Sequence, residues 1–196
     1  MKHRVLFAVS FAALAIAGCK KEAPASQDAT ATTAPATEIV PGSDMPTADT
    51  TQSQAQDPAQ AFANAAAASD AFEIATSKLA IANSQSANVK RFAGKMIDAH
   101  TQSTEKLKLV AGKMSPSISP DASLSDAQQQ AVDAMKNLSG ADFDKAYAKA
   151  QVDGHQATLD KLKAYVASSD AAPALKTLAK ELIPVVTAHL NMAKAL

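Results

Sequence analysis

The chain has 196 residues, with 19 basic and 19 acidic side chains and therefore no net charge at pH 7. It has one cysteine and no tryptophan, and only 4% of its residues are aromatic. A single cysteine excludes an intrachain disulfide and a cysteine-based zinc site. Nucleic-acid-binding proteins need a basic face, often with interleaved aromatic residues, so we expect no nucleic-acid partner.

The first eighteen residues predict a lipoprotein signal peptide. Residues 2–4 are basic, and the mostly apolar run over 5–16 has the length of a signal peptide but is too short to span a bilayer. The run ends in Leu14-Ala15-Ile16-Ala17-Gly18-Cys19, which resembles the lipobox of bacterial lipoproteins. We therefore expect residues 1–18 to be removed and Cys19 to carry acyl chains such as palmitate, which anchor the protein to a membrane.

The residues after Cys19 predict a location and a tether. Lys20 stands where an aspartate would retain many lipoproteins in the inner membrane, so the periplasmic side of the outer membrane is favoured. Residues 19–56 form the lipidated start and a segment of Ala, Thr, Pro, Ser, Gln and Asp with few large apolar side chains. Such a composition cannot offset the entropy of ordering, so we expect a disordered tether with a reach of about 33 Å.

A helical domain is expected over residues 57–196. Asp57 is a suitable N-cap and Pro58 a suitable first helical residue. Apolar residues recur at helical spacing beyond this point, and no strand-like alternation is present. We expect long helices over residues 57–83, 87–113, 139–167 and 173–196, and a short helix that Ser125 and Gln128 begin and that ends near residue 140.

The lengths of the connections predict how these helices are arranged. The first two long helices and the last two are joined by short turns, which make antiparallel neighbours. Nearly thirty residues separate the second long helix from the third. This combination favours an all-α, ferritin-like four-helix bundle, with a long crossover that carries the extra short helix.

Three histidines fall on the apolar stripes of three different helices. His100 interrupts a heptad stripe that runs from Val89 to Met114, and His155 lies on the stripe of the third long helix. His189 lies on the heptad stripe of the last helix, whose other members are Leu175, Leu178, Leu182, Val185, Met192 and Leu196. Counting residues from the turns at 1.5 Å per residue places the histidines and Glu73, one residue from each long helix, near the middle of the bundle.

Two interpretations of these residues remain open. Neutral imidazoles are good metal ligands, and a buried glutamate needs a partner, so His100, His155, His189 and Glu73 can form a mononuclear site. Nitrogen-rich ligation favours copper or zinc. Alternatively, the histidines are structural and are hydrogen-bonded within the core, with Glu73, Gln151, Tyr147 and Ser103 as the expected partners.

Several motifs resemble one bacterial family across all four long helices. They are Ala71-Phe72-Glu73-Ile74-Ala75, Val89-Lys90-x-Phe92-Ala93-x-x-Met96-Ile97-Asp98-x-His100, Phe143-Asp144-x-x-Tyr147, Gln151-Val152-x-x-His155 and Ala188-His189-Leu190. In order and spacing they are similar to the envelope proteins catalogued as domain of unknown function 4142. The resemblance implies a ferritin-like bundle in the cell envelope, and it brings no established activity.

The chain departs from the ferritins at the positions that bind iron. Di-iron carboxylate sites place a glutamate three residues before a histidine on two helices. Here Ile97, Val152 and Val186 occupy those positions. We therefore expect no di-iron centre.

Two function hypotheses follow from the sequence. One is a copper- or zinc-binding envelope module, and the other is a non-catalytic structural or stress-related lipoprotein that contacts other envelope proteins. No nucleophile elbow or phosphate-binding glycine loop is present. The sequence therefore assigns no catalytic or cofactor-binding residues and favours a protein that is not an enzyme.

Overall fold

The structure, a computed structural model, describes residues 57–196, which form five helices and no strand. The bundle consists of α1 (Pro58–Asn83), α2 (Ala87–Gly112), α4 (Gly140–Ala167) and α5 (Pro173–Ala193), and α3 (Asp126–Lys136) lies in the crossover. None of these helices is both long and apolar enough to cross a membrane. The predicted signal peptide, the lipidated Cys19 and the tether fall on residues outside the described part.

Local sequence signals explain where most helices begin. The Asp57 carboxylate accepts a hydrogen bond from the backbone N–H of Ala59 at 2.9 Å, and Pro58 follows in the first turn. Ser125 and Gln128 form the predicted capping box of α3. The predicted boundaries hold to within a few residues, except that the last helix ends at Ala193, before the end of the chain.

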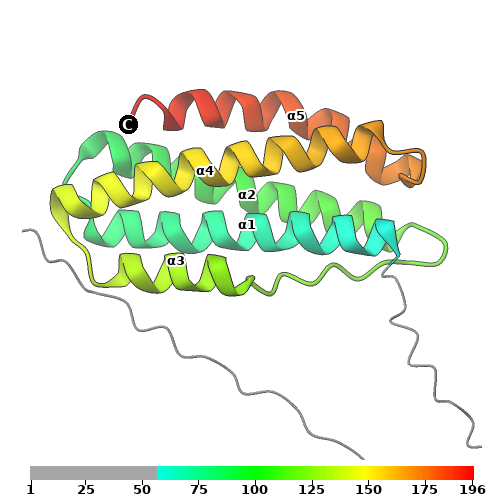
Figure 1. The fold of residues 1–196 in the computed structure, drawn as a ribbon, viewed down its shortest axis with the longest axis horizontal. Coiled ribbons are helices and arrows are strands. Elements are labelled where there is room, and N and C mark those ends of the chain that lie inside the picture. Colours follow the sequence, from blue (N-terminus) through cyan, green and yellow to red (C-terminus); the bar gives the residue numbers. More distant parts are fainter. Residues whose placement is uncertain (1–56) are drawn as a thin grey trace, which may run out of the picture. The chain divides into compact units, whose positions relative to one another are not determined.

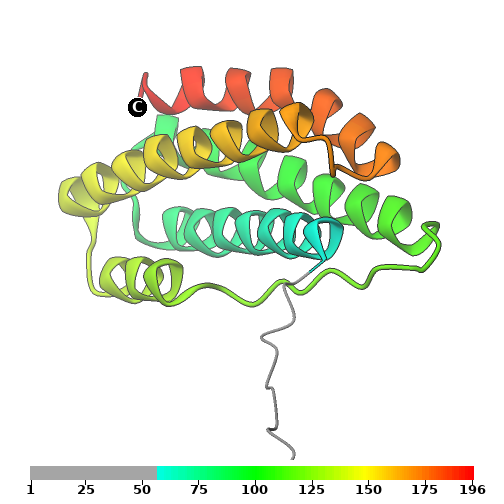
Figure 2. The same ribbon diagram turned by 45° about the vertical axis from the view of Figure 1, so that its right-hand side comes forward.

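The connectivity confirms the predicted all-α bundle with ferritin-like wiring. Short turns join α1 to α2 and α4 to α5 as antiparallel pairs (Figure 1). Residues 113–139 return along the bundle, so that α4 starts at the same end as α2. Helix α1 packs against α4 and α2 packs against α5, while α3 lies on the outside of the bundle beside α1 (Figure 2).

Buried polar residues separate two apolar clusters inside the bundle. One cluster includes Leu107, Leu162 and Leu175, and the other includes Met96 and Phe143. The buried polar side chains come mainly from the middle of the helices between these clusters: Asp70, Glu73, Thr76, Ser77, His100, Gln151, His155 and His189. Buried polar groups lower the free energy of unfolding unless they are paired, so a polar layer inside a core indicates a functional site.

One predicted stripe is wrong in part. A strict heptad on the last helix places Val185 inside, but this side chain is 44% exposed, and Val186 is buried instead. The buried residues Leu175, Ala179, Val186 and Leu190 follow the 3.6-residue period of a straight helix. The two periods diverge over several turns, which accounts for the difference.

A hydroxyl pair in the core provides a test of the packing between α1 and α4. The hydroxyls of Ser77 and Tyr147 are 2.8 Å apart and buried. We expect Tyr147→Phe or Ser77→Ala to lower the free energy of unfolding by about 1–3 kcal/mol, because each leaves a buried hydroxyl without a partner. In urea denaturation the double variant should lose less than the sum of the two single variants. Strictly additive losses would show that the two hydroxyls do not interact.

Candidate metal centre

The structure brings the three predicted histidines together at one point of the core. His100 from α2, His155 from α4 and His189 from α5 each offer a ring nitrogen, and these three nitrogens lie within 4.8 Å of one another. The ring centroids are 5.5–5.7 Å apart in all three pairs. No carboxylate belongs to this group in the part of the chain that the structure describes.

A carboxylate on α1 orients the ring of His100. The Nδ1 of His100 lies 2.8 Å from Oδ1 of Asp70, and the hydroxyl of Thr104 lies 3.2 Å from Oδ2 of Asp70 and 2.9 Å from the carbonyl oxygen of His100. Asp70 and His100 are both buried. The carboxylate accepts the Nδ1 proton and leaves the lone pair of Nε2 free, which is the usual way in which proteins orient a histidine ligand.

The backbone orients the ring of His155 in the same sense. Its Nδ1 is 2.8 Å from the carbonyl oxygen of Gln151, one turn earlier on α4. A carbonyl can only accept, so Nδ1 carries the proton and Nε2 keeps its lone pair. The side chain of Gln151 donates instead to the hydroxyl of Thr76 at 3.2 Å.

One nitrogen of each histidine has no hydrogen-bond partner among the described residues. These buried atoms are Nε2 of His100, Nε2 of His155 and Nδ1 of His189. An unpaired buried polar atom costs about 1–3 kcal/mol, and structures normally pair such atoms. Each of the three clustered histidines therefore has a buried nitrogen whose lone pair is available to a metal ion.

Burial keeps His155 and His189 neutral. It lowers the pKa of His155 from 6.5 to about 4, and the neighbouring His100 and His189 act in the same direction. Burial likewise lowers the pKa of His189 to about 4. Neutral imidazole is the form that binds metal, so both side chains are ready to do so at neutral pH.

Glu73 lies beside the group rather than in it. Its Oε1 is 3.6 Å from Nδ1 of His155, the ring nitrogen that is bonded to the backbone, and its Oε2 has no hydrogen-bond partner among the described residues. Burial raises the pKa of Glu73 to about 7, against the opposing effect of His100. The carboxylate of Glu73 therefore contacts Nδ1 of His155 and not the nitrogen that has a free lone pair. Of the four predicted ligands, only the three histidines come together as a group.

The chain matches the family described as domain of unknown function (DUF4142) over residues 44–196. This match covers most of the chain. The protein belongs to the DUF4142 family. No curated protein and no solved structure matches the chain.

The hydrogen-bond partners of the DUF4142 histidines differ from those expected from the sequence. Among the described residues, the side chains of Ser103 and Tyr147 do not bond to them, and Gln151 does so through its backbone carbonyl. The main partner, Asp70, was not predicted. It lies three residues before Glu73, one turn away on α1, and this spacing was the available signal.

A missing side chain on α4 makes room for Glu73. A Cβ at Gly154 would lie 2.9 Å from Oε1 of Glu73, closer than ordinary contacts allow. Glycine in a helix interior costs about 1 kcal/mol relative to alanine. Here it allows α4 to approach the carboxylate and to place His155, the next residue, in the core.

Replacing Glu73 by glutamine tests whether the buried carboxylate destabilises the folded protein when it is ionised at high pH. The pKa of Glu73 is about 7 in the folded protein and 4.5 ordinarily, so its contribution to stability is lost as the pH rises from 4.5 through 7. Relative to the parent, Glu73→Gln should gain on the order of 3 kcal/mol in free energy of unfolding between pH 5 and pH 8. Urea denaturation of the metal-free proteins measures this gain. A difference that does not change with pH would contradict the assignment.

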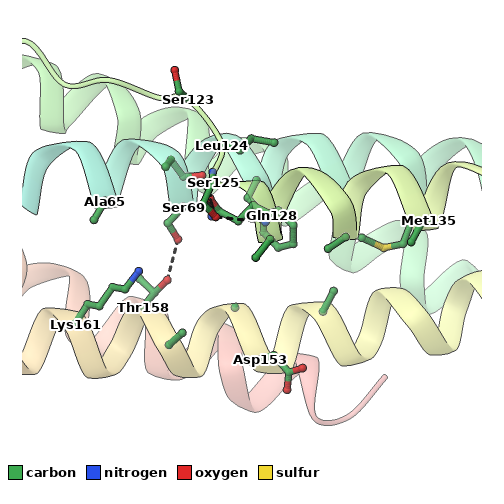
Figure 3. A pocket seen from close by; sticks show the side chains of 18 of the residues that line it. Ala65, Ser69, Ser123, Leu124, Ser125, Gln128, Met135, Asp153, Thr158 and Lys161 are labelled. Atoms are coloured by element: carbon green, nitrogen blue, oxygen red, sulfur yellow. Dashed lines mark hydrogen bonds between the residues drawn. The ribbon is translucent and has the colours of Figure 1, made fainter. Parts of the chain in front are cut away.

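Two hollows lie on either side of a hydrogen bond between α1 and α4. A pocket of about 240 Å³ adjoins His100 and His189, and an apolar groove of about 900 Å³ lies between α3, α4 and α1. Ser69 and Thr158 line both hollows, and their hydroxyls are 2.8 Å apart (Figure 3). Beside Ser69, the side chain of Gln128 donates to the carbonyl of Ala68 at 3.3 Å and fastens α3 to α1.

Proposed function

We propose that this protein is a metal-binding module of the bacterial cell envelope, which holds one copper or zinc ion through His100, His155 and His189. The observation that carries the proposal is the group of three clustered histidines, one from each of three helices, each with a buried ring nitrogen that has no partner among the described residues. A structural role for the histidines does not account for this arrangement, because each unpaired nitrogen costs stability.

The choice of ion follows from the donor atoms. Among the described residues, the group consists of three imidazoles and contains no thiolate and no carboxylate. Such a set of ligands suits zinc or copper. In a tetrahedral zinc site with Zn–N bonds of 2.0–2.1 Å, ligand nitrogens lie about 3.4 Å apart. The spacing of up to 4.8 Å here requires a small inward movement of the rings when the ion binds. Asp70 is not a ligand itself, but its hydrogen bond with Nδ1 of His100 holds that ring in position.

The location is part of the same proposal. The sequence Leu14–Cys19 supports lipidation at Cys19, and Lys20 supports the outer membrane. The composition of residues 19–56 supports a tether between that anchor and the helical domain. On this proposal the metal centre works in the periplasm, close to the membrane and to other envelope proteins.

The test is the metal content of the purified protein. The protein is prepared without chelators or a histidine tag, stripped of metal, and titrated with zinc and with copper. We expect one ion per chain, with a gain in melting temperature that depends on the metal concentration. A folded protein that binds neither ion at stoichiometric levels would overturn the proposal. The histidines would then be core residues of a structural or stress-related envelope protein.

A further inference from the structure

We infer that the pocket beside His100 and His189 admits a small monovalent anion, which becomes the fourth ligand of the bound ion. The inference rests on the proposed function, because it needs the ion. It adds that the centre is open to small molecules from solution. A closed centre would only stabilise the fold, whereas an open one exchanges ligands.

The position of the pocket supports an open centre. Residues of all four bundle helices line the pocket, most of them from α2 and α5, and they include His100 and His189 but not His155. The exposed fractions agree, since His155 is 1% exposed, His100 6% and His189 9%. His155 is therefore enclosed by the core, whereas His100 and His189 border a pocket of about 240 Å³.

Coordination chemistry leaves a position to fill on that side. Zinc and copper(II) accept at least four ligands, and three are provided by the histidines. Glu73 lies at the outer nitrogen of His155, and Asp70 is bonded to His100 and Thr104. Neither Glu73 nor Asp70 belongs to the three-histidine group, so the fourth ligand of the bound ion has to come from the pocket.

The charges around the pocket favour an anion. Two carboxylates line it, Asp70 at the histidines and Glu181 at the rim, and Lys106 at the rim forms an ion pair with Glu181. A divalent ion and the Lys106 ammonium together exceed these two negative charges by one. A single negative charge restores the balance, and the side chain of Ser103 offers a hydroxyl in the same pocket.

The experiment uses azide as the anion and the copper(II)-loaded protein as the reporter. Azide bound to copper(II) produces a charge-transfer band in the visible spectrum, and its growth with azide concentration gives a dissociation constant. We expect saturable binding of one azide per copper. The Ala99→Leu variant fills the pocket at a half-buried position on α2, and it should weaken azide binding about tenfold or more while copper binding is kept. Ala150→Leu, a half-buried alanine of the groove on α4, is the matched control and should not change it.

Charge variants at the rim provide a second measurement. Lys106→Gln should weaken azide binding by about twofold to fivefold, because the ion pair of this lysine is half-exposed. Glu181→Gln removes the opposing carboxylate and should strengthen it. Lys149→Gln, from the ion pair with Asp153 at the groove, serves as the control.

The outcomes separate this inference from the proposed function. Copper binding without any azide band, or an azide affinity that is unchanged in both Ala99→Leu and Lys106→Gln, overturns the open centre and leaves the metal module standing. Failure to bind copper or zinc at all overturns both.

Discussion

Replacing His155 by leucine is expected to abolish stoichiometric metal binding while the metal-free protein stays folded, with an equal or higher free energy of unfolding. The side chain is 1% exposed and its Nε2 has no partner among the described residues. Its Nδ1 is hydrogen-bonded to a carbonyl of its own helix and lies 3.6 Å from the carboxylate of Glu73. Leucine fits a buried helical position and removes the cost of the unpaired nitrogen. The loss in metal affinity should exceed about 100-fold, because one of three ligands is gone.

The matching variant on α2 should behave differently. His100→Leu also removes a ligand, but it takes the main partner from the buried carboxylate of Asp70 and leaves only Thr104. We therefore expect this variant to lose metal and also about 2–4 kcal/mol of stability. Metal titration and urea denaturation of both variants measure the contrast. Ser103→Ala, in the pocket but outside the histidine group, should keep its metal. Undiminished metal binding by His155→Leu would refute the assigned ligands.

Acidification is expected to destabilise the metal-free protein between pH 6.5 and pH 4. The folded-state pKa values of His155 and His189 are about 4, below the ordinary 6.5, so the unfolded chain binds more protons in this range. The stability that these two residues contribute is complete above pH 6.5 and is lost as the pH falls towards 4. Each histidine accounts for about 3 kcal/mol.

Glu73 opposes this trend, so its effect has to be subtracted. Its pKa of about 7 means that the folded protein gains stability from this residue as the pH falls from 7 to 4.5. The net loss is therefore on the order of 3 kcal/mol in the parent and about twice that in Glu73→Gln. Denaturant midpoints at pH 7 and pH 4.5 measure both values. The double variant His155→Leu/His189→Leu serves as the control, and it should not lose stability on acidification through these groups.

Much of this fold was accessible from the sequence because its signals are local. Asp57 followed by Pro58, and Ser125 followed by Gln128, are capping patterns that depend on a few neighbouring residues. The meeting of His100 with the histidines of α4 and α5 was also predictable, since interrupted apolar stripes at similar heights must face each other in a four-helix bundle.

The parts that were missed depend on side-chain geometry. Helix α1 is rich in alanine, which is small enough to lie inside or outside, so its buried face gives a weak pattern and Asp70 was overlooked. The height of Glu73 was predicted, but which ring nitrogen its carboxylate approaches depends on rotamers. The pocket and the groove result from the volumes of many small side chains, and no spacing rule reveals them.

The fastening of α3 has a consequence for how the protein opens. This helix buries only Val132 and Met135 and is tied to α1 through the side chain of Gln128. The bundle helices, by contrast, enclose the core and the histidines. We therefore expect α3 to have a lower local stability than the bundle helices, and its amide protons should exchange with solvent well before those of α1 or α4. A breathing motion of this kind would widen the groove while the histidine group stays assembled.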